Sequence, residues 1–425
     1  MLAHEIRGLG DLAGAALKAG ADRVRQTHRG IAGRVFRNIG PASTPVRIVH
    51  DGISAAVYTG VGGALSAGGR TAGAVLADVA GDGFALRDAP RGRIVLSLLN
   101  GWHGDRLDED GNGLALPMTV RARGRDVPVE TRELAEAHRP ATGRIAVFLH
   151  GLVENEGAWA YKSVRHHGRP GVTYGDLLRA DLGYTPVQVR YNTGLRISAN
   201  GGRLDALLAG LAEAWPVPVE DLLLIGHSMG GLVIRSALAQ AVERGSAWPA
   251  AVRDTVTLGT PHLGAPLEQG AALLTHALDR VGETRAVAAV LAARSAGIKD
   301  LRHGSLLEAD WADRHPDALG GPPPSAVPLH EGARHFVVVG TVTRRPGSPV
   351  GDLLGDLLGD LLVRPRSACG EDAGERRFDL PGEHVCRVAG VHHFDLLNHP
   401  EVYARIRDWL TDRPAGEPAG GEAAG

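Results

Sequence analysis

The residue of this sequence best suited to chemistry is Ser228, at the centre of a Gly-His-Ser-Met-Gly motif spanning residues 226–230. The apolar run Asp-Leu-Leu-Leu-Ile at 221–225 comes directly before it, and a helical pattern at 230–244 follows. A serine at a sharp strand-to-helix turn has a strained backbone that pushes its hydroxyl out above the sheet. This context predicts that Ser228 is a nucleophile, and the alternative is a solvated serine in a glycine-rich turn.

A serine hydroxyl becomes reactive at neutral pH when a histidine takes its proton and a carboxylate orients that histidine. In the fold that uses this turn, both partners follow the serine in the chain, the carboxylate first. The downstream segment 390–397 reads Gly-Val-His-His-Phe-Asp-Leu-Leu and lies between a short expected strand at 385–388 and the last expected helix. His392 and His393 are therefore candidate bases, with His399 at the expected start of that helix as a third.

Candidate carboxylates lie in the segment 351–362, which repeats Gly-Asp-Leu-Leu three times. A four-residue period places Asp352, Asp356 and Asp360 along nearly one face of a helix. A low-complexity helical insertion with solvated aspartates accounts for two of the three. The repeat alone leaves open which one orients the histidine.

The surrounding pattern predicts the elements that position these residues. Short apolar runs alternate with helical patterns, and a hairpin is expected around Gly124. We expect strands at 118–129 (the hairpin), 144–149, 186–191, 221–225, 252–258, 336–340 and 385–388, and helices at 174–181, 200–215, 230–244 and 400–410. This alternation predicts an α/β fold in which helices cover both faces of a mostly parallel sheet.

The ends of the chain and one long insertion differ from this pattern. Residues 1–90 read as helical, and 93–99 as either a strand or a buried helical turn. We expect a helical N-terminal extension at 1–114, the α/β domain at 115–412 and a disordered tail at 413–425. The Ala/Leu-rich insertion at about 265–333 is expected to form a cap or lid, or else a packing decoration without a gating role.

Composition limits the classes of protein to which the chain can belong. The 425 residues carry a formal net charge of −2 and show no basic stripe, so we expect no nucleic-acid partner. The two cysteines match neither a disulfide framework nor a zinc pattern, and we expect no metal or cofactor. No apolar signal segment or convincing membrane span is seen, so a cytoplasmic protein is expected. The oligomeric state stays open.

Over roughly residues 115–411 the chain resembles the α/β-hydrolase superfamily, in particular its lipases and esterases. His150-Gly151, at the end of an apolar run, is similar to the lipase His-Gly oxyanion motif. The heptapeptide Thr-Pro-His-Leu-Gly-Ala-Pro at 260–266 resembles a motif of the lipases and of the glycosylphosphatidylinositol inositol-deacylase-like group. This resemblance implies that the backbone N–H groups of Leu152 and Met229 form an oxyanion hole, which stabilises the charge of a tetrahedral intermediate.

The same resemblance favours one base and one acid. His393 precedes Phe-Asp-Leu-Leu as in the lipase His-x-Asp-Leu-Leu motif, so it is preferred to His392 and His399. Asp360 is preferred to Asp352 and Asp356 because the residues after it resemble the lipase Asp-Gly-x-Val-Pro-x-x-Ser-Ala run. In this chain Leu361 replaces the glycine and Arg364 is inserted before the proline. Some secreted lipases imply a Cys369–Cys386 bridge, whereas a cytosolic setting favours free thiols.

These residues together predict a serine hydrolase that cleaves carboxylic esters through a Ser228–His393–Asp360 triad and an acyl-enzyme. The resemblance implies an ester or lipid of low molecular weight, with an apolar acyl group, as the substrate. The alternatives are acyl transfer, or thioester or amide cleavage, by the same triad. A further alternative is a binding module that retains the fold without catalysis.

Overall fold

The computed structural model describes residues 2–39, short stretches between 51 and 74, and residues 86–264, 295–313, 324–341, 363, 365–370 and 378–412. The chain forms two compact units, Met1–Ala115 with Gln269–Ser295, and Leu116–Glu268 with Ala296–Gly425. Most of the expected cap, the three candidate aspartates and the tail at 413–425 lie outside the described residues. The domain division drawn from the sequence stays a prediction.

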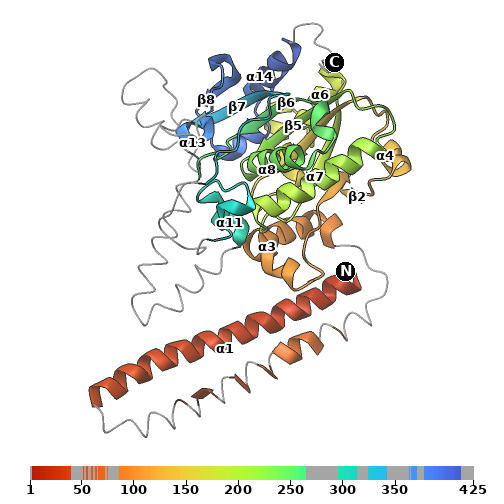
Figure 1. The fold of residues 1–425 in the computed structure, drawn as a ribbon. Helices are drawn as coiled ribbons and strands as arrows, with labels where there is room; N and C mark the ends of the chain where they lie inside the picture. Colours follow the sequence, from red (N-terminus) through yellow and green to blue (C-terminus); the bar gives the residue numbers. More distant parts are fainter. Residues whose placement is uncertain are drawn as a thin grey trace. The chain divides into compact units, whose positions relative to one another are not determined.

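The first unit contains two long helices, α1 (Ala3–Ile39) and α3 (Pro90–Glu109), and the short η2 (Leu86–Asp88) (Figure 1). Residues 93–99, which the sequence left open between strand and helix, belong to α3. Pro90 begins that helix, where its missing N–H costs nothing. The carboxylate of Glu5 accepts the N–H groups of Leu2 at 3.0 Å and Leu86 at 2.7 Å, which fastens η2 to the start of α1.

The second unit is built on a sheet to which, within the described residues, eight strands contribute in the order β2-β1-β4-β3-β5-β6-β7-β8. The strands are β1 (Thr119–Ala122), β2 (Arg125–Val127), β3 (Arg144–Leu149), β4 (Thr185–Arg190), β5 (Asp221–His227), β6 (Val252–Leu258), β7 (Arg334–Thr341) and β8 (Val385–Ala389). β1 pairs antiparallel with β2 and β4, and the remaining pairs are parallel. The predicted mostly parallel sheet is confirmed.

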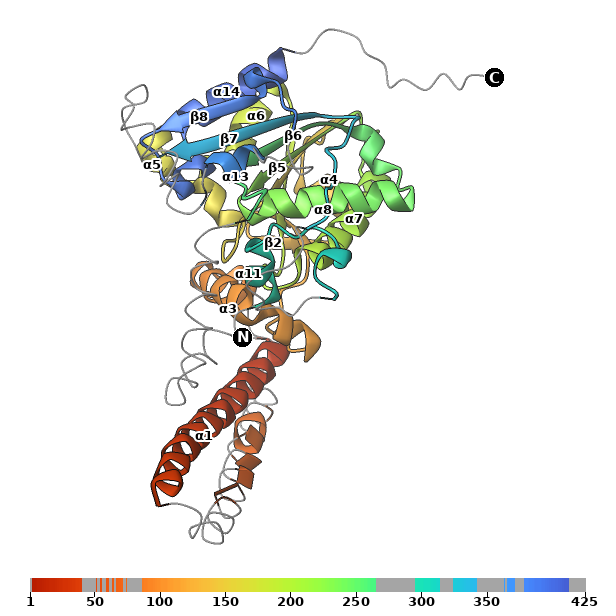
Figure 2. The ribbon, with the colours of Figure 1, turned by 60° about the vertical axis from the view of Figure 1, so that its left-hand side comes forward.

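Helices cover both faces of this sheet, as the sequence predicted (Figure 2). Within its described residues, the α-helices of this unit are α4 (Thr131–Ala137), α5 (Ser163–His167), α6 (Tyr174–Leu182), α7 (Ile197–Ala214), α8 (Met229–Arg244), α11 (Ala296–Leu301), α13 (Pro365–Cys369) and α14 (Pro400–Thr411). Short 3₁₀ turns are η3 (Glu156–Ala160), η4 (Trp248–Ala251), η5 (Glu308–Asp310), η6 (Gly382–His384) and η7 (His393–Leu397). α7 and α8 lie on one face, and α6 and α14 on the other.

Successive side chains of a strand point to opposite faces of the sheet, so the core has two parts, one on each face. In β3, Val147 belongs to an apolar cluster with side chains of α7 and α8, whereas its neighbour Phe148 belongs to a second cluster with side chains of α6 and α14. Both side chains are fully buried. A strand covered on both faces needs apolar residues at every position, and this explains the uninterrupted run of β3.

Turn chemistry sets the ends of several elements. The hairpin between β1 and β2 turns at Arg123 and Gly124, whose φ angles of 51° and 80° match a two-residue type I′ turn. α8 ends at Gly245, which has a left-handed φ of 71°. Cys369 and Cys386 are both buried, and no disulfide joins them. Among the described helices, none combines the length and apolarity needed to cross a membrane.

The packing of α8 predicts that the same substitution at two positions changes the free energy of unfolding by very different amounts. Val233 is fully buried in the cluster beneath α8, and Val242 on the same helix is 57% exposed. We expect Val233→Ala to lower the free energy of unfolding by about 2 kcal/mol, because it removes two buried methyl groups and leaves a cavity. Val242→Ala should change it by less than about 0.5 kcal/mol. Urea denaturation would measure both, and equal losses would contradict this packing.

Candidate active site

Ser228 occupies the tight turn between β5 and α8, in the strand-to-helix context that the sequence predicted. Its backbone has φ 52° and ψ −119°, a left-handed φ that is uncommon for a residue with a side chain. Two hydrogen bonds hold it there. The Ser228 N–H donates to the carbonyl of Leu258 in β6 at 2.9 Å, and the Ser228 carbonyl accepts from the N–H of Gly231 at 3.2 Å. The neighbouring strand and the helix therefore maintain the strained conformation.

The motif glycines are required by the crowding around this turn. A Cβ on Gly226 would lie 2.5 Å from the backbone nitrogen of Gly231. A Cβ on Gly230 would lie 2.4 Å from the carbonyl oxygen of Leu149, at the end of β3. Both obstacles are backbone atoms that cannot move aside, so the close approach of β3, β5 and α8 depends on glycine at these positions.

The loop after β3 carries Leu152, whose N–H the sequence predicts to be an oxyanion donor. The N–H of Gly151 donates to the Glu154 carboxylate at 2.7 Å, that of Val153 to the Thr193 hydroxyl at 3.2 Å, and that of Glu154 to the Gly151 carbonyl at 3.3 Å. The N–H of Leu152 has no acceptor among the described residues. The loop therefore leaves the N–H of Leu152 available to a ligand.

This loop lies directly against the Ser228 turn. A Cβ on Gly151 would be 3.0 Å from the Cβ of Ser228, so the two residues are in close contact. Met229 is the first residue of α8, where a backbone N–H has no acceptor within the helix. Two backbone donors thus lie on segments that meet at Ser228, although their role in an oxyanion hole stays a prediction.

His393 is also brought to this turn. It is buried, begins η7, and its ring centroid lies 4.6 Å from that of His227, the residue before Ser228. A Cβ on Gly259 would lie 3.0 Å from Nδ1 and Cε1 of His393, and Gly259 follows the Leu258 carbonyl that holds Ser228. The contacts on both sides place the His393 ring beside the Ser228 turn.

The neighbouring histidine belongs to a different cluster. The side chain of His392 is 37% exposed, and its Nε2 lies 3.2 Å from Asp395 and 3.2 Å from the Lys162 ammonium. Lys162 donates to Asp395 at 2.6 Å, which ties η7 to the segment between η3 and α5. Burial opposes ionisation of Asp395, but the hydrogen bonds from Lys162 and from the His392 N–H lower its pKa. This ion pair braces the turn that carries His393.

The remaining candidates lie elsewhere. His399 is the N-cap of α14, and its ring packs against His166 with 5.4 Å between centroids. Asp360 and its rivals Asp352 and Asp356 lie outside the described residues, so the acid of the triad stays a prediction.

Sequence reasoning missed one buried carboxylate at this site. Glu154 lies 3.0 Å from Nδ1 of His227 and accepts the N–H of Gly151. Burial opposes its ionisation, but the charge and hydrogen bond of His227 and the N–H of Gly151 lower its pKa. Glu154 and His227 are 73 positions apart in the chain, and no motif links them.

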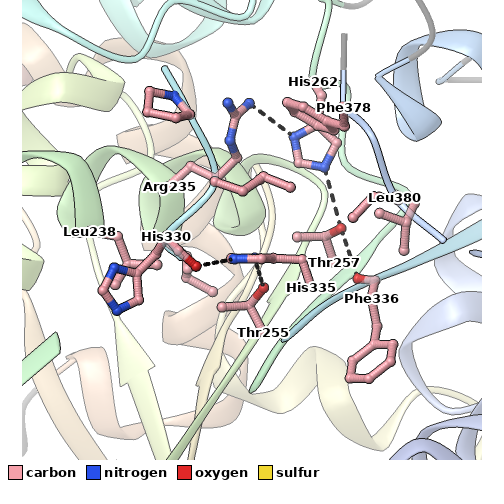
Figure 3. Close-up of a pocket in the computed structure, with 14 residues that line it drawn as sticks. Arg235, Leu238, Thr255, Thr257, His262, His330, His335, Phe336, Phe378 and Leu380 are labelled. Carbon is pink, nitrogen blue, oxygen red and sulfur yellow. Dashed lines mark hydrogen bonds between the residues drawn. The ribbon is translucent and has the colours of Figure 1, made fainter. Parts of the chain in front are cut away.

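A small pocket lies between α8 and the strands β6 and β7 (Figure 3). Arg235 of α8 contacts Nδ1 of His262 at 3.4 Å, and Nε2 of His262 contacts the Thr257 hydroxyl at 3.3 Å. The cavity measures about 20 Å³, enough for roughly one water molecule. His262, from the Thr-Pro-His motif, therefore links α8 to β6.

One family model matches the chain, that of the PGAP1-like alpha/beta domain, over residues 206–314. The matched segment contains the Ser228 turn and the motif at 260–266, and it confirms the resemblance expected from them. No curated protein matches the chain.

Solved structures that are similar to the chain include three hydrolases. Mature Bacillus licheniformis lipase BlEst2 is 19% identical, with a TM-score of 0.39, and the match covers 64% of this chain and 93% of the lipase. Pyrococcus furiosus esterase Pf2001 is 14% identical, with a TM-score of 0.35 and coverages of 64% and 83%. Bacillus subtilis naproxen esterase is 14% identical, with a TM-score of 0.31 and coverages of 64% and 85%.

The contribution of the Lys162–Asp395 ion pair to stability should depend on pH. Because the pKa of Asp395 is lowered in the folded chain, its contribution to stability is present above the unfolded pKa of about 3.9 and is lost as the pH falls through the folded value. We expect Lys162→Met to lower the free energy of unfolding by about 1 kcal/mol at pH 7. The difference from wild type should shrink below about pH 4.

Lys18→Met is the control for this prediction. Lys18 lies 3.7 Å from Asp22, and their side chains are 54% and 42% exposed, so its loss should change stability by less than about 0.5 kcal/mol. Denaturant titrations of both variants from pH 3 to 8 would measure the effect. A loss for Lys162→Met that is independent of pH would contradict the role given to Asp395.

Proposed function

We propose that this chain, which has the α/β-hydrolase fold, is a serine hydrolase that cleaves carboxylic esters with Ser228 as the nucleophile. The observation that carries the proposal is the left-handed backbone of Ser228 in the turn between β5 and α8. A conformation this costly, by roughly 1–3 kcal/mol, persists where the surroundings enforce it, and such strain clusters at active sites. A solvated serine in an ordinary turn would need neither the strain nor the crowded glycines.

In the proposed reaction, His393 accepts the proton of the Ser228 hydroxyl as its oxygen attacks the ester carbonyl carbon. The N–H groups of Leu152 and Met229 stabilise the oxyanion that forms. His393 then gives the proton to the departing alcohol, and an acyl-enzyme remains on Ser228. A water molecule, deprotonated by His393, releases the carboxylic acid and regenerates the serine. Asp360 is the proposed carboxylate that orients His393.

An ester with an apolar acyl group is the proposed substrate. Phe394 is 39% exposed, and its ring centroid lies 5.7 Å from that of His393. The ring of Tyr161 is 6.4 Å away from that of Phe394. An exposed aromatic side chain next to the proposed base offers an apolar surface to an acyl chain. The proposal requires no metal ion or organic cofactor.

Removal of the Ser228 hydroxyl should abolish ester hydrolysis. We expect Ser228→Ala to reduce kcat for p-nitrophenyl esters by about 10⁴-fold or more, since no other group can form the acyl-enzyme. A fluorophosphonate should label the wild type at Ser228 and leave the variant unlabelled. Turnover by Ser228→Ala at the wild-type rate would refute the proposal. Formation of a new ester in the presence of added alcohol would indicate acyl transfer.

The two adjacent histidines provide a matched test of the base. His393→Asn should reduce kcat by about 10³-fold or more, because the Ser228 proton then has no acceptor. His392→Asn should retain kcat within about tenfold, since His392 packs with Lys162 and Asp395. Steady-state kinetics on one ester would compare them, and the opposite ranking would transfer the role of base to His392.

A further inference from the structure

We propose that Glu154 and His227 form a buried positioning pair that holds the oxyanion loop and the base-bearing turn in register around Ser228. This inference rests on the proposed function, because it assigns the pair a task within that site. Neither residue contacts the reacting atoms in this role. Each acts through the backbone of a neighbouring segment.

The first step is the contact of the pair with the loop after β3. One carboxylate oxygen of Glu154 lies 3.0 Å from Nδ1 of His227, and the other lies 3.1 Å from the same nitrogen. This second oxygen also accepts the N–H of Gly151 at 2.7 Å. Gly151 directly precedes Leu152, the proposed oxyanion donor. The carboxylate therefore determines where the loop can place that donor.

The second step is the contact of the pair with the turn that carries the base. Nε2 of His227 lies 3.2 Å from the backbone carbonyl oxygen of His393. A carbonyl oxygen can only accept, so Nε2 carries the proton of this hydrogen bond. One imidazole thus joins the loop after β3, through Glu154, to the first residue of η7.

The third step is burial, because hydrogen bonds that are shielded from water are stronger. The side chain of His227 is fully buried and that of Glu154 is 7% exposed. A Cβ on Gly151 would lie 3.0 Å from Cβ of Ser228 and 3.1 Å from both the Glu154 carboxylate and Nδ1 of His227. The pair and Ser228 therefore both contact Gly151. A displacement of the loop after β3 or of η7 would move the groups around the Ser228 hydroxyl.

The expected consequence is a loss in kcat rather than in substrate binding. Misplacing an oxyanion donor or a base by about 1 Å costs on the order of 10²-fold in rate. Glu154→Ala should therefore lower kcat by about 10²-fold and leave KM within about threefold. The rate of fluorophosphonate labelling at Ser228 should fall in proportion to kcat.

Glu154→Gln separates the positioning role of Glu154 from the effect of its charge. In Glu154→Gln the amide oxygen can still accept the N–H of Gly151, and the amide N–H can donate to Nδ1 of His227. Both links remain while the charge is lost, so kcat should stay within about tenfold of wild type. A loss as large as that of Glu154→Ala would overturn the positioning role.

Two further variants serve as controls for an effect on folding. Glu154→Gln/His227→Leu keeps both side chains close to their original volumes and buries no charge, yet it removes the link to His393, so its kcat should fall by about 10²-fold even if Glu154→Ala does not fold. Asp205→Ala removes a buried carboxylate that accepts from Arg244, Ser246 and Trp248 at the opposite end of α8. It should lower Tm and leave kcat and KM within a few-fold.

The outcomes distinguish this inference from the proposed function. Failure of the wild-type protein to be labelled by a fluorophosphonate or to hydrolyse any ester would overturn both. A labelled, active wild type together with undiminished kcat in folded Glu154→Ala and in the double variant would overturn only the positioning pair. A large fall in kcat for Asp205→Ala would also overturn it, since any loss of stability would then reduce the rate.

Discussion

The described site depends on one constraint, the left-handed backbone of Ser228 between β5 and α8. The Leu258 carbonyl in β6 accepts the N–H of the serine, and glycines at 226 and 230 let β3, β5 and α8 approach closely enough to enclose it. Without the parallel pairing of β5 with both neighbours, the turn would relax to an ordinary conformation. The sheet thus maintains the strain at Ser228.

Neighbouring segments then gather around this point because of the strand order. β3 and β6 flank β5, so the loop after β3 and the residues after β6 emerge beside Ser228. η7 follows β8 at the edge of the sheet and brings His393 against Gly259, with the Lys162–Asp395 ion pair beneath it. Parallel strands deliver all of these segments to the same edge, where α/β folds place their ligand sites.

Much of the sheet was predictable from the sequence, since strands buried on both faces read as continuous apolar runs. The bounds of β3 and β6 match the predicted ones, because polar or turn residues flank both runs. β5 extends two residues further than predicted. Gly226 and His227 were interpreted as part of the turn, whereas in the structure they pair with Thr257 and Leu258. β7 begins two residues early, at Arg334, which forms an ion pair with Asp254 at 2.8 Å.

The site was less predictable where it depends on contacts between distant segments. The motif around Ser228 is contiguous in the sequence, so the position of the turn could be predicted. His392 and His393 are adjacent in the sequence, and their difference in burial is visible only in the structure. The contact between Glu154 and His227 arises from the register of β3 with β5, in which Leu149 lies opposite Gly226. No local pattern encodes that register. The threefold Gly-Asp-Leu-Leu repeat is degenerate, so the sequence alone could not distinguish among its aspartates.

The parallel sheet has a consequence for how the molecule is assembled. Each strand beside β5 is distant from it in the chain, so loop closure must precede the pairing that shapes the turn at Ser228. Local helices such as α8 can form within about a microsecond, but the Ser228 turn, the loop after β3 and η7 converge only after β3, β5, β6, β7 and β8 have docked. A partly folded intermediate would therefore contain helices and lack the strained turn at Ser228, and formation of that turn would mark the final stage of folding.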